Sequence, residues 1–162
     1  MKVGELFYAE WMRESASTRN MLSSVPEAKF SWKPHEKSKP LGALALHVAA
    51  LPGRWLYLFD NDTFDPTVVK QPSLEGKDDI IRLFDEGSAK LTGRLKDTDE
   101  AEYDKTFTFS IGGKPTFTMS KAMGFRTLLF DHMIHHRAQL SVYLRLLDFP
   151  VPGMYGPTAD EQ

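Results

Sequence analysis

The chain has 162 residues, of which 41% are hydrophobic and 26% charged, a balance typical of one globular domain with a sizeable core. The formal net charge of −2 shows no basic excess of the kind that nucleic-acid-binding proteins carry, and the absence of cysteine excludes disulfides, thiolate catalysis and cysteine-ligated zinc. Any metal would therefore be bound by histidine, carboxylate or water.

The N-terminal residues lack the long apolar core of a signal peptide. No run approaches the ~18 consecutive apolar residues of a membrane span. We therefore expect a single domain over residues 1–162, located in the cytoplasm, with neither nucleic acid nor membrane as a partner.

Apolar residues recur at helical spacing over residues 3–24, which predicts a first helix. The segment 30–40 contains two prolines and a cluster of charged residues, so we expect a long ordered loop there. Phe30 and Trp32 are expected to fix this loop to the rest of the protein. His35 lies in the loop outside any helical register, and we assign it to the surface.

A second helix is expected to begin near residues 38–40 and to follow an apolar pattern as far as Phe59. His47 lies among these apolar positions, about two turns from the start. A single histidine in that setting is either a core residue bonded to a carbonyl or side chain, or part of a site. Pro52 cannot donate a helical hydrogen bond, so we expect a kink or break at Pro52 and Gly53, one turn after His47.

Residues 61–72 form a polar linker, after which Ser73 offers an N-cap. A third helix is predicted over residues 78–96, with a charged outer face. The alternation of polar and apolar residues in 106–111 and 116–119, on either side of a Gly-Gly pair, predicts a small β-hairpin or extended clasp.

The fourth and longest helix is predicted to begin after Ser120 and to end near Leu147. One continuous stripe runs along it and contains Phe125, Leu129, His132, His136, Leu140, Tyr143 and Leu147. This stripe predicts a core face with two histidines in its middle. His135 falls on a more polar stripe, which we assign to the flank of the helix.

His132 and His136 are four residues apart and therefore lie on one helix face, where two imidazoles can reach one metal ion. They could equally form a hydrogen-bonded pair at the edge of the core. Burying two neighbouring imidazoles without partners is costly. A shared cation or neighbouring acceptors would each remove that cost.

Four long amphipathic helices with histidines midway along the second and fourth resemble the DinB superfamily, which comprises the DinB/YfiT-like metalloenzymes. The resemblance covers nearly the whole chain. Its marks, in chain order, are Trp32–Ser38, Leu41–His47, His132–Leu140, Tyr143–Arg145 and the proline- and glycine-rich tail Pro150–Glu161, which we expect to pack back on the helices.

The resemblance implies an all-α fold, a four-helix bundle with a long crossover connection, to which the hairpin between the third and fourth helices would be added. It also implies that one histidine from the second helix and two from the fourth bind a divalent transition metal, which maps onto His47, His132 and His136. Zinc or nickel is the expected metal, and a homodimer the expected assembly.

Three neutral imidazoles with an open fourth position form a catalytic rather than a structural arrangement. The resemblance implies an enzyme of the thiol S-transferase or hydrolase kind acting on a small molecule. Gln139 and Asp131 could orient the histidines, and Arg137 is expected to pair with a carboxylate. No residue pattern indicates a general base or a nucleophile, so the catalytic residues stay unassigned.

Two other functions stay open from the sequence: a non-catalytic metal-binding or stress-response protein, and a histidine-lined pocket that binds a small ligand without metal. A cavity leading from solvent to the histidines would favour the enzyme. A sealed site would favour the non-catalytic protein, and ring nitrogens too far apart for one ion would favour the metal-free pocket.

Overall fold

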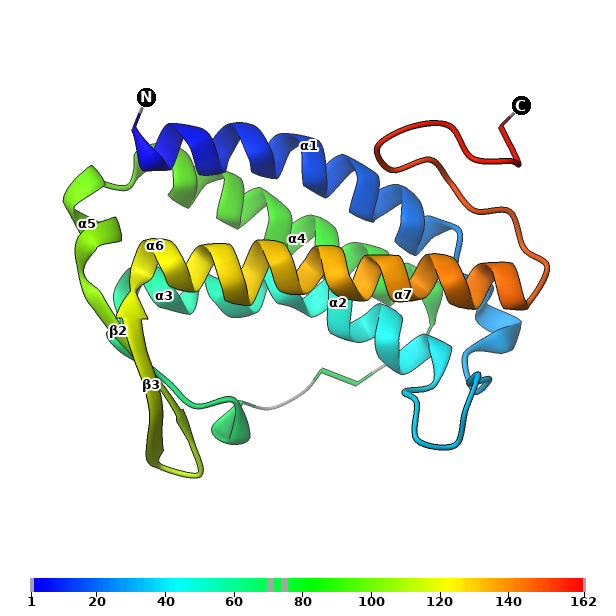
Figure 1. Ribbon diagram of the computed structural model, residues 1–162, viewed down its shortest axis with the longest axis horizontal. Helices are drawn as coiled ribbons and strands as arrows, with labels where there is room; N and C mark the ends of the chain where they lie inside the picture. The colour runs from blue at the N-terminus through cyan, green and yellow to red at the C-terminus, as the bar shows by residue number, and fades with distance from the viewer. Residues whose placement is uncertain (1, 70–71, 74–75, 162) are drawn as a thin grey trace.

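Long helices aligned with the longest axis make up most of the protein (Figure 1). The computed structural model describes residues 2–69, 72–73 and 76–161. The long helical segments are α1 (Val3–Ser23), α2 (Leu41–Trp55) with α3 (Tyr57–Asp60), α4 (Lys77–Asp97), and the continuous run of α6 (Lys121–Gly124), the π-helical η3 (Phe125–Asp131) and α7 (His132–Leu146). Shorter helices are η1 (Glu27–Lys29), η2 (Pro66–Val68) and α5 (Glu100–Asp104). The helical prediction is confirmed for most of the chain.

A small three-stranded sheet accompanies the helices, so the fold is not purely α. Strands β2 (Thr106–Ile111) and β3 (Lys114–Ser120) form the predicted antiparallel hairpin. Its turn is made by two glycines with φ of 58° and 76°, a conformation that costs glycine little. The third strand, β1 (Thr63–Phe64), pairs parallel to β2 and was not predicted, because two residues in a polar segment give no alternation to recognise.

The core between the helices is rich in aromatic side chains. Phe7 of α1 stacks on Phe130 with ring centroids 5.4 Å apart, and Trp11 meets the same ring edge-on at 6.1 Å. Phe125 lies 6.1 Å from Phe7. Fully burying one such ring is worth about 1.5–3 kcal/mol, so this cluster fixes the α6–η3–α7 run against α1.

Helices α2 and α4 approach each other closely at two glycines. A Cβ atom on Gly87 of α4 would lie 2.8 Å from the backbone nitrogen of Gly53 in α2 and 3.3 Å from Pro52 Cγ.

The expected break at Pro52 is wrong. Helix α2 runs through it to Trp55, and the interruption falls at Leu56. Packing against Gly87 supports the helix at the turn where proline removes a hydrogen bond.

The start of α4 also differs from the prediction. Gly76, not Ser73, is the N-cap residue, and Ser73 lies before the helix, separated from it by residues outside the described part. Glu27 supplies the acceptor instead, since its Oε2 lies 2.8 Å from the backbone nitrogen of Lys77. A carboxylate at this position also interacts favourably with the helix dipole.

The segment Leu41–Asp60 has the length and apolar composition of a membrane span, with a mean hydropathy of 1.2. However, 61% of the window is buried inside the protein. The segment also contacts α4 at Gly53. Such burial is typical of the core helix of a globular fold.

The loop before α2 and the C-terminal tail both pack back on the helices, as expected. Trp32 meets Tyr143 of α7 edge-on at 5.6 Å, and Val151 is buried. The carboxylate of Asp160 bonds both Arg145 and the backbone nitrogen of Val151. The tail is therefore closed on itself and fastened to α7 through Arg145.

Candidate metal centre

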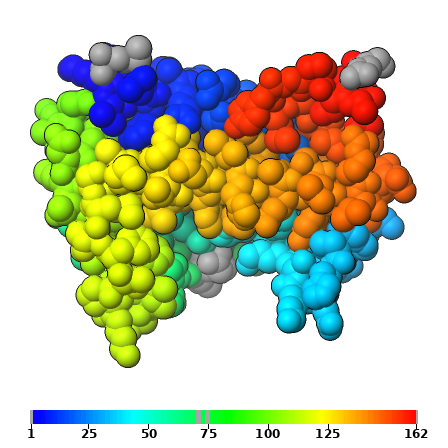
Figure 2. Space-filling model, viewed as in Figure 1, coloured from blue at the N-terminus to red at the C-terminus, as the bar shows by residue number. Residues whose placement is uncertain are grey.

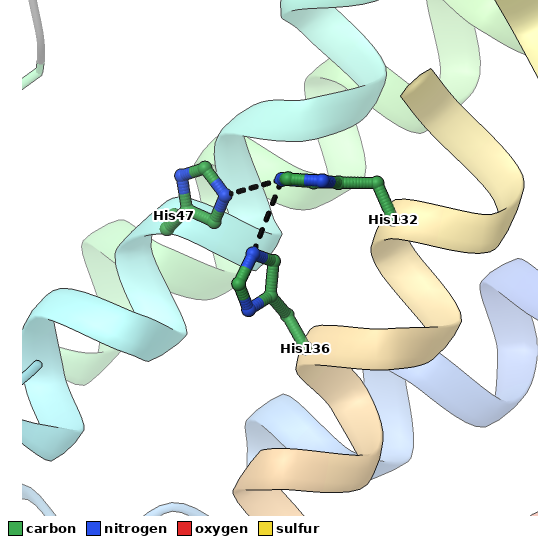
Figure 3. A group of neighbouring side chains, drawn as sticks. All are labelled: His47, His132 and His136. Atoms are coloured by element: carbon green, nitrogen blue, oxygen red, sulfur yellow. Dashed lines mark hydrogen bonds between the residues drawn. The ribbon is translucent and has the colours of Figure 1, made fainter. Parts of the chain in front are cut away.

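His47, His132 and His136 point toward one another between α2 and α7 (Figure 3). The Nε2 atom of His132 lies 2.8 Å from His47 Nε2 and 3.1 Å from His136 Nε2. One ring nitrogen from each histidine lies within 4.8 Å of the other two. The three residues that the sequence singled out are therefore in mutual contact.

The position of the two α7 histidines differs from the predicted stripe. They are half-buried at the edge of the core, whereas Met133, Arg137 and Leu140 are fully buried beside them. They directly follow η3, and a π-helix has more residues per turn than the α-helix assumed for the stripe. The histidines thus face α2 and the surface rather than the centre of the core.

Gln139 holds the ring of His136, as the sequence suggested it could. Its Oε1 lies 2.7 Å from His136 Nδ1. An amide oxygen can only accept, so Nδ1 carries the proton and Nε2 presents its lone pair to the cluster. Metal-binding histidines commonly donate the N–H of their other ring nitrogen to such an acceptor, which fixes both the tautomer and the orientation of the ring.

The cluster has the dimensions of a three-imidazole metal site. Metal–nitrogen bonds of about 2.0–2.1 Å at tetrahedral angles place the ligand nitrogens roughly 3.3 Å apart. The two close nitrogen separations here, 2.8 and 3.1 Å, are slightly shorter. Small ring rotations would therefore accommodate one ion, and the three-histidine group could hold a metal.

Comparison with known proteins agrees with this architecture. The model of the DinB family matches residues 1–162. The chain belongs to the DinB family. The uncharacterized protein YrdA of Bacillus subtilis is 25% identical over 156 residues, which cover 96% of this chain and 89% of YrdA.

Solved DinB-like structures share the fold. A protein from Bacillus cereus superposes with a TM-score of 0.73 at 22% identity, covering 93% of this chain and 97% of its own. YjoA of Bacillus subtilis gives 0.71 at 19%, with coverages of 92% and 97%. A DinB-family member from Exiguobacterium sibiricum gives 0.67 at 18%, with coverages of 100% and 99%.

All three histidines of this DinB protein have lowered pKa values. Burial is the main cause, and it brings the pKa of His47 to about 3 and that of His132 to about 4. Burial also lowers the pKa of His136, although its hydrogen bond to Gln139 acts in the opposite direction. The imidazoles are therefore neutral at pH 7, the state in which they bind metals.

Two further cations act on the cluster, and neither was recognised as a site residue from sequence spacing. Arg54 lies two turns after His47 on α2 and, like Lys39, contributes to the lowered pKa values of His47 and His132. Each disfavours a positive charge on the rings. Their approach to the site depends on how α2 and the preceding loop fold.

The remaining residues considered from the sequence lie elsewhere. His35 and His135 are exposed, as expected, although the His135 ring lies 4.9 Å from that of His136. Asp131 does not orient a histidine; its nearest charged partner is Arg126, at 3.8 Å. The expectation that Arg137 pairs with a carboxylate is confirmed, since its Nη2 lies 2.7 Å from Glu14 Oε2.

A cavity of about 280 Å³ borders the centre at His136. It is lined by Lys37, Ser38, Lys39, Leu44, His136, Gln139 and Tyr143. In the space-filling view, the loop that carries the lysines projects from the lower edge, separated from the hairpin by a notch (Figure 2). The site of this DinB protein is thus open at His136.

A larger hollow of about 660 Å³ lies further along α2, beside Ala50, Gly53 and Arg54. It is mostly apolar and is also lined by Val69, Pro72, Ser73 and Leu83. None of the three histidines lines it. The cavity at His136 is therefore the one that bears on the candidate centre.

Proposed function

We propose that His47, His132 and His136 bind one divalent transition metal, zinc or nickel, and that the protein is a metal-dependent enzyme acting on a small molecule. The observation that carries the proposal is the convergence of three neutral ring nitrogens beside a cavity that His136 lines. Structural zinc sites have four protein ligands, whereas three ligands and an opening are typical of catalytic sites.

The reaction class follows from what such a centre can activate. A bound metal would supply a Lewis acid that deprotonates water near neutral pH or holds a thiol as thiolate. The chain's own contribution is positional: Gln139 orients His136, and burial keeps the rings neutral. Thiol transfer and hydrolysis are the two reactions that this arrangement supports.

We also propose that the site belongs to a four-helix bundle with a long crossover connection. The supporting arrangement consists of α1, α2, α4 and the α6–η3–α7 run, with the crossover between α3 and α4 (Figure 1). Bundles of this kind commonly build metal sites from side chains on facing helices. The alternative of a sealed, non-catalytic metal protein is less well supported, because the cavity opens at His136.

A substrate screen tests the proposed activity. Zinc- and nickel-loaded protein is assayed with electrophiles and low-molecular-weight thiols, and separately with ester and amide substrates. We expect turnover that disappears in His136→Ala and persists in His135→Ala, the matched exposed neighbour. Metal-loaded protein that turns over none of these substrates, or activity unaffected by His136→Ala, would contradict the enzyme proposal.

A further inference from the structure

The cavity at His136 has an unbalanced charge. Among its described lining residues are two lysines, Lys37 and Lys39, and no carboxylate. The remaining lining residues, Ser38, Leu44, His136, Gln139 and Tyr143, contribute no negative charge. A divalent ion on the histidines would add two further positive charges. Any occupant of this cavity therefore experiences a strongly positive potential.

The lysine-bearing segment is held in place rather than free to swing away. The hydroxyl of Tyr143 in α7 donates to the backbone carbonyl of Lys39 at 3.2 Å, and the Trp32 ring packs on Tyr143. The backbone nitrogen of Leu41 bonds the carbonyl of Trp32 at 2.8 Å, which closes the loop onto the start of α2. The lysines are thus anchored through their backbone at the mouth of the cavity.

The volume limits the class of occupant. About 280 Å³ is at the lower end of the range for ligand pockets, so the cavity suits a small molecule and not a peptide or nucleic acid. Its lining combines two exposed lysines with the imidazole of His136. A ligand that satisfies both carries an acidic group and, a few bonds away, a donor atom for the metal.

We propose that the cavity selects small acidic substrates, whose carboxylate is bound by Lys37 and Lys39 while the reacting group lies at the histidine centre. This inference rests on the proposed metal site and adds the substrate class and two specificity-determining residues to it. The acid would be held by charge at the mouth, so that its reacting end is directed inward.

Binding of matched thiols to the nickel-loaded protein tests the inference. The probes are 3-mercaptopropionate and its neutral analogue 3-mercaptopropionamide, compared by isothermal titration calorimetry and by thiolate-to-nickel charge-transfer absorption. We expect the wild type to prefer the acid by about tenfold, equivalent to about 1.4 kcal/mol. Raising the salt concentration should reduce the preference, because ions screen exposed charges.

The variant Lys37→Met/Lys39→Met should lose most of this preference and retain its affinity for the neutral thiol. Lys29→Met/Lys90→Met removes the same charge at two exposed positions that do not line the cavity, and should behave as the wild type. Nickel-loaded wild type that binds both thiols equally, or a preference that survives loss of both cavity lysines, would overturn the inference alone. Failure of the wild type to take up nickel would overturn the metal site as well, so the two failures are distinguishable.

Discussion

At the scale of single residues, the contact between Gln139 and His136 decides which ring nitrogen faces the cluster. The sequence placed Gln139 three residues after His136, on the same helix face, which made the contact foreseeable. The same reasoning failed for Asp131, because it ignored the neighbouring Arg126. Sequence spacing shows which side chains can meet, but the competition among partners is settled only by the fold.

Replacing Gln139 should weaken metal binding without unfolding the protein. In Gln139→Leu the His136 ring loses the acceptor at Nδ1, and we expect a 10- to 100-fold lower metal affinity, the usual loss for such partners. Competition with a chromogenic chelator measures it. Gln139→Glu keeps an acceptor and should retain most of the affinity, whereas an unchanged affinity in Gln139→Leu would show that the contact does not position the ring.

Arg137 forms the centre of a buried ionic network next to the histidines. Its Nη2 lies 2.7 Å from Glu14 Oε2 and 2.7 Å from the Tyr155 hydroxyl, and both charged side chains are 1% exposed. Burial acts to raise the pKa of Glu14, but the hydrogen bonds from Arg137 and Tyr155 outweigh it, and the pKa is lowered overall. The network joins α1, α7 and the C-terminal tail.

Arg137→Met should be severely destabilising, because the buried Glu14 carboxylate loses its buried cation and keeps only the exposed Arg13 as a charged partner. We expect a loss of about 3–5 kcal/mol in the free energy of unfolding, measured by urea denaturation. The double variant Glu14→Leu/Arg137→Met should recover much of it. Arg145→Met, which breaks an exposed pair with Asp160, is the control and should cost far less. Equal losses in the two single variants would refute the structural role of the buried pair.

At the scale of elements, the order of the long helices and the hairpin followed from apolar periodicity and turn residues. The π-helical η3 did not, since nothing in Phe125–Asp131 distinguishes a π-helix from an α-helix by pattern. The histidines that follow it lie at the edge of the core rather than in its centre. The lysines of the cavity were also missed as site residues, because their approach to α7 depends on how the loop 30–40 folds back.

Helix packing at Gly87 provides a test at this scale. Gly87→Ala would place a methyl group against the backbone of Gly53, and we expect a destabilisation of about 1–3 kcal/mol in urea unfolding, typical of overpacking. The matched control is Gly93→Ala on the same helix, where a Cβ meets nothing within 4 Å. That change should be neutral or stabilising, by up to about 1 kcal/mol, because alanine favours helices. Similar effects at both glycines would contradict the close approach of α2 and α4.

At the scale of the whole molecule, the histidine centre couples stability to pH. In the unfolded chain these histidines titrate near pH 6.5, whereas burial keeps the pKa of His47 at about 3 and that of His132 at about 4 in the fold. Below pH 6.5 the unfolded state therefore binds protons that the folded state does not. The contribution of these histidines to the free energy of unfolding is therefore largest above pH 6.5 and falls as the pH decreases toward 4.

The metal-free protein should accordingly lose free energy of unfolding between pH 7 and pH 5. Urea denaturation across this range measures the slope. In His47→Leu/His132→Leu the slope should be clearly smaller, and His135→Ala, which changes an exposed neighbour, should leave it unchanged. A slope that is identical in the double variant would show that the cluster is not the source of the pH dependence.

The claim that the three histidines hold one metal ion can be tested by elemental analysis of tag-free protein purified without chelator. We expect about one transition metal per chain in the wild type and in His135→Ala, and none in His47→Ala or His132→Ala, with all variants still helical by circular dichroism. Wild-type protein that contains no metal and takes up neither zinc nor nickel would contradict the claim, as would metal retained at full stoichiometry in the two cluster variants.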